Sequence, residues 1–214
     1  MEEEKKPVKT WEEYFAEVIG SVESRPFVKP EEVPAIDLYM DQVTSFLGEH
    51  FDSVKRRDSD KLLTRTMINN YTKSGVLPSP EKKKYSRDHM YLLLFIFYLK
   101  NLLSIEDIRN LLEPMAEMFH KTESDVGIPK IYEEIFGICS EKAEETVKEL
   151  KEQFRRSNMS FADTEDEKEK EFLKMFSFIS MLSYDVYLKK QVLVKIIDGF
   201  REEYSDGEGE RKKK

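Results

Sequence analysis

The stretch that decides the fold runs from Leu62 to Leu112 and reads LLTRTMINNYTKSGVLPSPEKKKYSRDHMYLLLFIFYLKNLLSIEDIRNLL. Thr64 is a suitable helix N-cap, and apolar residues at helical spacing follow it. Gly75 can adopt the left-handed conformation that ends a helix, and the prolines after it cannot continue one. The pattern therefore predicts a helix from Thr64 to Ser74, a short extended hairpin that carries three lysines, and then two further helices.

An excess of basic residues marks the same stretch. From Lys61 to Arg87 there are seven basic residues and a single acidic one, Glu81, which leaves a net charge of about +6 in a chain whose total is -8. Because the rest of the chain is acidic, a random surface would not carry this basic island. Phosphate is its natural partner, and a helix followed by a basic hairpin fits a DNA groove and the backbone beside it.

The basic island supplies the predicted contacts to duplex DNA, namely Thr64, Arg65, Asn69, Asn70, Tyr71, Lys73, Lys82, Lys83, Lys84, Tyr85 and Arg87. Asn69 and Asn70 are expected to read adenine edges, because a side-chain amide both donates and accepts, and Arg65 to bind guanine or phosphate. The residues expected mainly to bind phosphates are Thr64, Tyr71, Lys83, Lys84, Tyr85 and Arg87. The alternative is that the lysines form a solvated turn and the asparagines are polar filler on an exposed helix face.

Four segments of the stretch resemble the DNA-binding domain of MerR-type regulators. They are TRTMINNY at residues 64–71, GVLP at 75–78, KYS at 84–86 and LKNLLSIEDIR at 99–109. The family called domain of unknown function 1836 is more similar still, because it also matches DLYMDQV at residues 37–43. The resemblance covers about residues 33 to 115. It implies a winged helix-turn-helix that binds an inverted repeat as a two-fold dimer.

Two features depart from the MerR pattern. Asn69 and Asn70 stand where that family usually has an Arg-Tyr pair, and residues 52–62 lengthen the link between the first two helices. The operator and the docking on DNA are therefore not carried over from the resemblance.

Composition favours an all-α, mostly helical fold with a small β-wing. The chain has only eight glycines in 214 residues, and 12% aromatic residues are too many for a disordered chain. We expect a MerR-like winged helix-turn-helix plus a C-terminal helical dimerisation region. The expected parts are an N-terminal tail and short amphipathic helix at residues 1–32, the winged helix-turn-helix at 33–115, the helical C-terminal region at 116–204 and a disordered tail at 205–214.

Local signals place several helix ends. Thr10 with Glu13 forms a capping box ahead of the first helix, and a second helix is expected from about Ile36 to Phe51. Ser104 with Asp107 is expected to cap the helix that runs through Leu111 and Leu112. Pro114 is expected to cause a bend or to start a new helix.

The segment from Phe172 to Phe200 has 18 apolar residues in 29, which is more than one helix stripe holds. We expect it to be buried on more than one side, with surface left over for a second copy of the chain, so that the protein is a homodimer. The aromatic residues of the second half are expected to form a core. A pocket for an unknown small-molecule effector among them is the alternative.

No motif points to an enzyme or a cofactor. The three histidines are far apart in sequence, so no metal site is predicted, and Cys139 is expected to be a small core residue. We find no phosphate-binding glycine loop, no Ser-His-Asp order and no Cys-x-x-Cys pair. The single cysteine fits a reducing cytoplasm, and neither a signal segment nor a membrane span is expected.

The sequence therefore predicts a DNA-binding transcription regulator. The alternatives are a helical protein-protein adaptor that uses the same winged helix and a helical domain that senses a small ligand.

Overall fold

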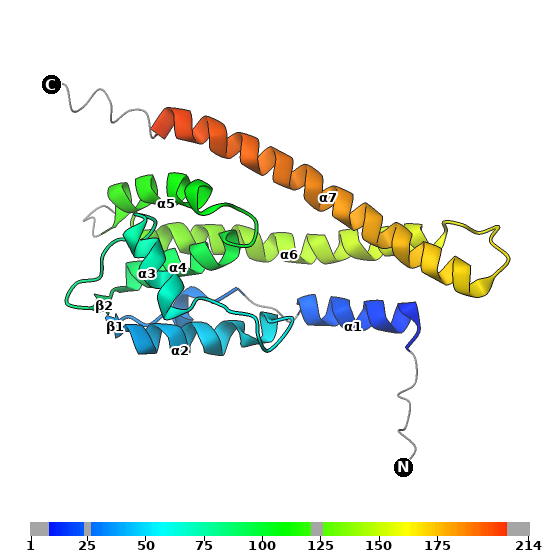
Figure 1. Cartoon of the computed structure of the whole chain (residues 1–214), viewed down its shortest axis with the longest axis horizontal. Helices are drawn as coiled ribbons and strands as arrows, with labels where there is room; N and C mark the ends of the chain where they lie inside the picture. The colour runs from blue at the N-terminus through cyan, green and yellow to red at the C-terminus, as the bar shows by residue number, and fades with distance from the viewer. Residues whose placement is uncertain (1–8, 24–26, 121–125, 205–214) are drawn as a thin grey trace, which may run out of the picture. The chain divides into compact units, whose positions relative to one another are not determined.

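The computed structural model describes residues 9–23, 27–120 and 126–204, and Figure 1 labels its helices and strands. Residues 1–8 of the predicted N-terminal tail and the tail predicted at residues 205–214 lie outside this part of the chain. The described residues are mostly α-helical with one two-stranded sheet, which confirms the prediction of a mostly helical fold. Those within 1–26 and 138–188 form one compact unit, called unit 1, and those within 27–137 and 189–214 form another, called unit 2.

The α-helices are α1 (Trp11–Glu23), α2 (Met40–Phe51), α3 (Arg65–Lys73), α4 (Arg87–Leu99), α5 (Ile105–Phe119), α6 (Ile128–Asn158) and α7 (Glu167–Tyr204). The strands are β1 (Leu38–Tyr39) and β2 (Lys84–Tyr85), and two short 3-10 turns cover Pro30–Glu32 and Asp52–Val54. Within the described residues, none of the helices combines the length and the apolar character needed to cross a membrane.

Unit 2 is built around α4, whose apolar residues cover its whole circumference. Residues 90–94 are all buried, so this helix has no solvent face over its central turns. Phe51 of α2 stacks on Phe97 with ring centroids 3.6 Å apart, and Tyr91 contacts Tyr132 of α6 at 4.8 Å. Ile197 of α7 is buried in the same core. Burial of large side chains is the main stabilising contribution to such a unit.

The helix predicted from Thr64 to Ser74 is confirmed as α3. The Thr64 hydroxyl accepts a hydrogen bond from the backbone N–H of Met67 at 3.3 Å, and the helix ends before Gly75, whose φ is +79°. The N–H of Gly75 donates to the Thr72 carbonyl, so a carbonyl of the last turn keeps a partner.

The small sheet joins two segments that are distant in sequence. Strand β1 pairs with β2 in antiparallel register, with Leu38 opposite Tyr85 and Tyr39 opposite Lys84. The prediction of a helix from about Ile36 is wrong at its start, because α2 begins only at Met40. Residues 38 and 39 are extended because they hydrogen-bond across to β2.

The helix α5 confirms one prediction and corrects another. Ser104 caps it as predicted, with its hydroxyl accepting from the backbone N–H of Asp107 at 3.1 Å. Pro114 neither ends α5 nor starts a new helix, since α5 continues through it to Phe119. Leu112 and Ala116 are buried on either side of the proline, and their packing holds the helix across the missing backbone donor.

Unit 1 is a small helical unit formed by α1, residues 138–158 of α6 and residues 167–188 of α7. The predicted capping box of α1 is confirmed, because Thr10 and Glu13 exchange hydrogen bonds of 2.9 and 3.2 Å. Its core is aromatic: Phe15 stacks on Phe154 with centroids 3.8 Å apart and meets the edge of Phe178 at 5.4 Å.

The expectation that residues 172–200 are buried on more than one side is wrong within the single chain. Phe178 and Ile197 are buried. The large apolar residues of this segment that are exposed are Phe172, Phe176, Ile179, Tyr184, Val186, Tyr187, Leu188, Val192 and Ile196. The segment belongs to one continuous helix, so a single side meets each core and the other side faces solvent.

Candidate nucleic-acid interface

One face of α3 is polar and exposed to solvent. The exposed residues are Arg65, Thr66, Asn69, Asn70 and Lys73, which recur at the spacing of a single helical face. Ile68 and Tyr71 point the other way and are buried in the core of unit 2. The helix is therefore anchored by its apolar side, while two amides and two cations remain exposed to solvent.

The exposed start of α3 is tied to α2 by an ion pair. The guanidinium of Arg65, the first residue of α3, pairs with the carboxylate of Asp41 in the first turn of α2. Both side chains remain largely exposed, Arg65 at 62% and Asp41 at 80%. The pair can therefore be reached from solvent and can be broken by a competing partner.

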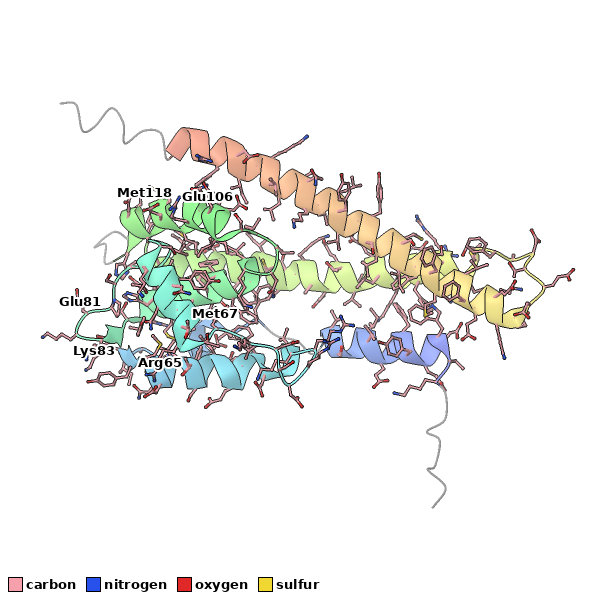
Figure 2. The ribbon with its side chains drawn as sticks, viewed as in Figure 1. Arg65, Met67, Glu81, Lys83, Glu106 and Met118 are labelled. Atoms are coloured by element: carbon pink, nitrogen blue, oxygen red, sulfur yellow. The ribbon has the colours of Figure 1, made fainter. Side chains whose placement is uncertain are left out.

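Residues 78–83, here called the lysine loop, end in a tight turn. The backbone N–H of Lys84 donates to the Glu81 carbonyl at 2.8 Å, which closes the turn over Lys82 and Lys83. Both of these lysines have positive φ values, 48° and 65°, a conformation that usually selects asparagine or glycine. Figure 2 shows Glu81 and Lys83 extending outward from the loop between α3 and β2.

Side chains of the segment from Tyr39 to Asp41 contact both the residue after the lysine loop and the first residue of α3. The ammonium of Lys84, directly after the loop, lies 5.3 Å from the ring centroid of Tyr39, in a cation–π contact. Two residues further along, Asp41 holds Arg65. The start of α3 and the base of the lysine loop therefore border the same short segment. Sequence reasoning assigned no role to Tyr39 or Asp41, although both lie in the DLYMDQV segment of the family resemblance.

Four predicted contact residues have structural roles in unit 2. Tyr71 and Tyr85 are buried, and burial raises the pKa of both phenols, so that they stay neutral. Thr64 caps α3, and its hydroxyl accepts from the Met67 N–H. Arg87 donates to the Pro30 carbonyl at 3.2 Å and lies over the Tyr91 ring at 5.6 Å. We leave these four residues out of the proposed interface.

The remaining predicted contacts carry most of the charge of this surface. Its cations are Arg65, Lys73, Lys82, Lys83 and Lys84. Asp41 and Glu81 are the acidic residues on the same elements, so the local excess is smaller than a count along the sequence indicates. Asn69 and Asn70 are the exposed amides between the two ends of this surface.

Two histidines that are distant in sequence meet beside β2. The rings of His89 and His120 pack edge to face with centroids 4.9 Å apart, and His120 Nδ1 lies 3.2 Å from a carboxylate oxygen of Asp88. Nδ1 of His89 accepts from the Ser86 backbone N–H at 3.1 Å, which ties it to the start of α4. In the part of the chain that the structure describes, no group of three His, Cys, Asp or Glu residues is arranged to hold a metal ion.

The aromatic residues of the second half form both core and surface. Phe154 and Phe178 are in the core of unit 1, as predicted for the aromatic residues, whereas Phe172 borders an open hollow with Trp11 and Tyr14. Cys139, predicted to be a core residue, is half-buried on α6.

Comparison with known proteins gives one match. The model of the family described as domain of unknown function (DUF1836) matches residues 28–135, a range that contains α3, the lysine loop and the segment from Tyr39 to Asp41. No curated protein and no solved structure matches the chain.

Proposed function

The chain belongs to the DUF1836 family, and we propose that it is a DNA-binding transcription regulator that holds duplex DNA as a dimer. The observation that carries the proposal is the pairing of two features around residues 39–41. Asp41 of this segment pairs with Arg65 of the exposed α3 face, and Tyr39 contacts Lys84 at the end of the lysine loop. A helix and a basic loop that border one segment suit a major groove and its flanking phosphates.

In this proposal α3 is the recognition helix and the lysine loop is the wing of a MerR-like winged helix-turn-helix. Asn69 and Asn70 read adenine edges, and Arg65 reads guanine or binds phosphate. Lys73, Lys82, Lys83 and Lys84 bind phosphates and set the register of the protein on the duplex. These residues need no cofactor, and the proposal includes no enzymatic step.

The dimer is proposed from the apolar residues that α7 leaves exposed in unit 1. Phe172, Phe176, Ile179 and Val186 recur at intervals of four, three and seven residues, close to the spacing of a helix-pairing seam. A second copy covers this stripe economically, because large exposed apolar patches are uncommon on monomers.

The test is binding to a random-sequence duplex library over a range of salt concentrations. If about three cations per protomer meet phosphates, a dimer neutralises roughly six, and the slope of log K against log salt is about -5. Affinity then falls roughly a thousandfold between about 50 and 200 mM salt. Absence of binding to every duplex at the lower salt concentration contradicts the proposal.

Replacing Asn69 and Asn70 with alanine separates base reading from phosphate binding. Each change is expected to cost about 1 to 3 kcal/mol on the selected site and little on random DNA. Alanine favours helices more than asparagine does, so the variants keep α3 folded. Equal losses on both DNAs assign the two amides to the backbone or to structure.

The second candidate is a protein-protein adaptor that uses the same surface. Tyr39 is 54% exposed, and Asp41 and Glu81 place two carboxylates among the cations, a mixture that suits a protein surface. A protein partner predicts a weaker response to salt than duplex DNA does. The salt titration therefore discriminates the two candidates.

A further inference from the structure

We propose that Asp41 lowers the affinity of the protein for duplex DNA, because its carboxylate competes with DNA for the Arg65 guanidinium. The inference rests on the proposed DNA-binding function and adds to it a residue with the opposite charge to the DNA-binding cations. The inference is drawn from the ion pair that Asp41, in the first turn of α2, forms with Arg65, the first residue of α3.

The pair is placed where DNA is proposed to bind. Arg65 opens the exposed face of α3 that continues through Asn69 and Asn70, and Asp41 follows Tyr39, which holds Lys84. Both members are more than half exposed, so a phosphate or a base edge can approach the guanidinium directly. Figure 2 labels Arg65 and Lys83, which come from the two elements that the segment at residues 39–41 connects.

The Arg65–Asp41 ion pair has little structural role in the fold. An exposed ion pair contributes little to stability, because both charges stay hydrated. The capping of α2 is provided by a neighbour, because the backbone N–H of Tyr39 donates to Gln42 Oε1 at 2.9 Å. A carboxylate in the first turn of α2 also complements the helix dipole, but that effect needs no partner on α3.

To contact DNA, Arg65 must exchange the Asp41 carboxylate for a group on the DNA. This exchange determines how Asp41 changes the affinity for DNA. On random DNA, Arg65 leaves one carboxylate for one phosphate, while the released Asp41 carboxylate stays near the phosphate backbone and repels it. On a preferred site, Arg65 gives up the same carboxylate for a bidentate contact to guanine O6 and N7. Because the same ion pair is broken on both DNAs, Asp41 lowers the affinity for random DNA and for the preferred site by about the same factor.

The experiment compares D41N with D37N in the full chain. Asp37 is exposed, lies four residues away and forms no ion pair with the residues that the structure describes, so D37N makes the same change in net charge without freeing Arg65. We expect D41N to bind both random duplex and the selected site roughly fivefold more tightly than D37N. Its salt slope is expected to be steeper by about one unit per protomer, because no released carboxylate then offsets the phosphate that Arg65 neutralises.

The same comparison in an R65Q background completes a double-mutant cycle, and there the difference between D41N and D37N on random duplex is expected to shrink, because no guanidinium is left to release. D41S serves as a second variant, because serine is also favourable near a helix start, and thermal unfolding of each variant reports that it is folded.

Equal affinities of D41N and D37N with Arg65 present overturn the inference. So does a loss of affinity for both DNAs in D41N, because Asp41 then positions Arg65 instead of competing for it. If the unaltered protein binds no duplex at low salt, the proposed function itself fails.

Discussion

Lys82 and Lys83 occupy a backbone conformation that is unfavourable for lysine. Their φ values of 48° and 65° place two successive residues in the left-handed region, where a side chain with a β-carbon costs about 1 kcal/mol or more. The most favourable pair for such a turn is Asn-Gly. Since the chain keeps two lysines there, their charge is expected to matter more than the stability they cost.

We predict that the double variant K82N/K83G is more stable and binds DNA less tightly. Its free energy of unfolding is expected to rise by about 1 kcal/mol, because the turn is relieved of strain. Its salt slope is expected to flatten by about two units per protomer, because two phosphate contacts are lost. Denaturant unfolding and duplex binding measure the two effects on the same sample.

The matched control is K82A/K83A, which removes the same charges and keeps a β-carbon at both positions. It is expected to lose the same DNA affinity without the gain in stability. Equal stability of the two double variants shows that the turn is not strained, and unchanged DNA affinity in both removes the lysine loop from the interface.

Helical period predicted part of the candidate site residue by residue. The helical period directs Arg65, Asn69 and Lys73 away from the side of Ile68, and the structure exposes all three. The period says nothing about Asp41, because its partner Arg65 lies 24 residues away and both are polar residues on separate helices. Such a pair becomes visible only when the packing of α2 on α3 is known.

At the scale of elements, the end of α3 sets where the lysine loop begins. Gly75 has a φ of +79°, and a β-carbon added there lies 3.4 Å from Glu113 Oε1. Gly48 provides a contrast, since it lies within α2 and a β-carbon added there meets nothing within 4 Å.

We predict opposite effects for the same substitution at these two glycines. Gly75→Ala is expected to lower the free energy of unfolding by about 1 to 2 kcal/mol, because alanine is strained in the left-handed conformation. Gly48→Ala is expected to raise it by up to about 1 kcal/mol, because alanine favours a helix interior. Urea unfolding followed by circular dichroism checks both. A neutral Gly75→Ala contradicts the assignment of Gly75 as the required helix stop.

Elements with strong local signals were predictable, and those fixed by distant partners were not. Thr64 and Ser104 are N-cap residues that mark the starts of α3 and α5 in the sequence, and both helices begin where expected. The start of α2 follows Tyr39, which is not a usual N-cap residue, and two-residue strands are too short to show an alternating pattern. The pairing of β1 with β2 therefore left no local signal in the sequence.

At the scale of the whole molecule, α7 leaves several large apolar residues of unit 1 exposed. Six large apolar residues of residues 172–187 are about half exposed, which leaves on the order of 500 Å² of apolar surface. Stable protein interfaces cover about 800 Å² on each partner. The stripe is therefore large enough to form the centre of an interface between two copies.

Sequence composition indicated this surplus but not where it lies. The count of 18 apolar residues in 29 was read as burial on more than one side, whereas one continuous helix leaves its second side open. A truncation of the chain near residue 121 is not a clean test of this exposed surface. Ile128, Tyr132 and Ile197 are buried in the core of unit 2, and the Tyr132 hydroxyl donates to the Val28 carbonyl at 2.8 Å. A truncation there removes core residues together with the stripe.

We predict instead that the full-length double variant F176E/I179E is a folded monomer. Both side chains are exposed in the single chain, at 56% and 49%, so charges there leave the core of unit 1 intact and disfavour a dry interface between copies. I105E is the matched control, because Ile105 is 48% exposed on α5, in unit 2. Sedimentation equilibrium is expected to find a dimer for the unaltered protein and for I105E.

Dimerisation also predicts how the salt dependence of DNA binding changes in the monomeric variant. A dimer is expected to place its two copies of α3 about 34 Å apart on one face of the duplex, in successive major grooves. The monomeric variant then binds only one half-site, and its salt slope falls from about -5 to about -3, because half of the phosphates are contacted. If the unaltered protein sediments as a monomer at micromolar concentration, the exposed stripe has another occupant. If F176E/I179E remains a dimer, the interface lies outside residues 172–187, and the copies meet through unit 2 or through the DNA itself.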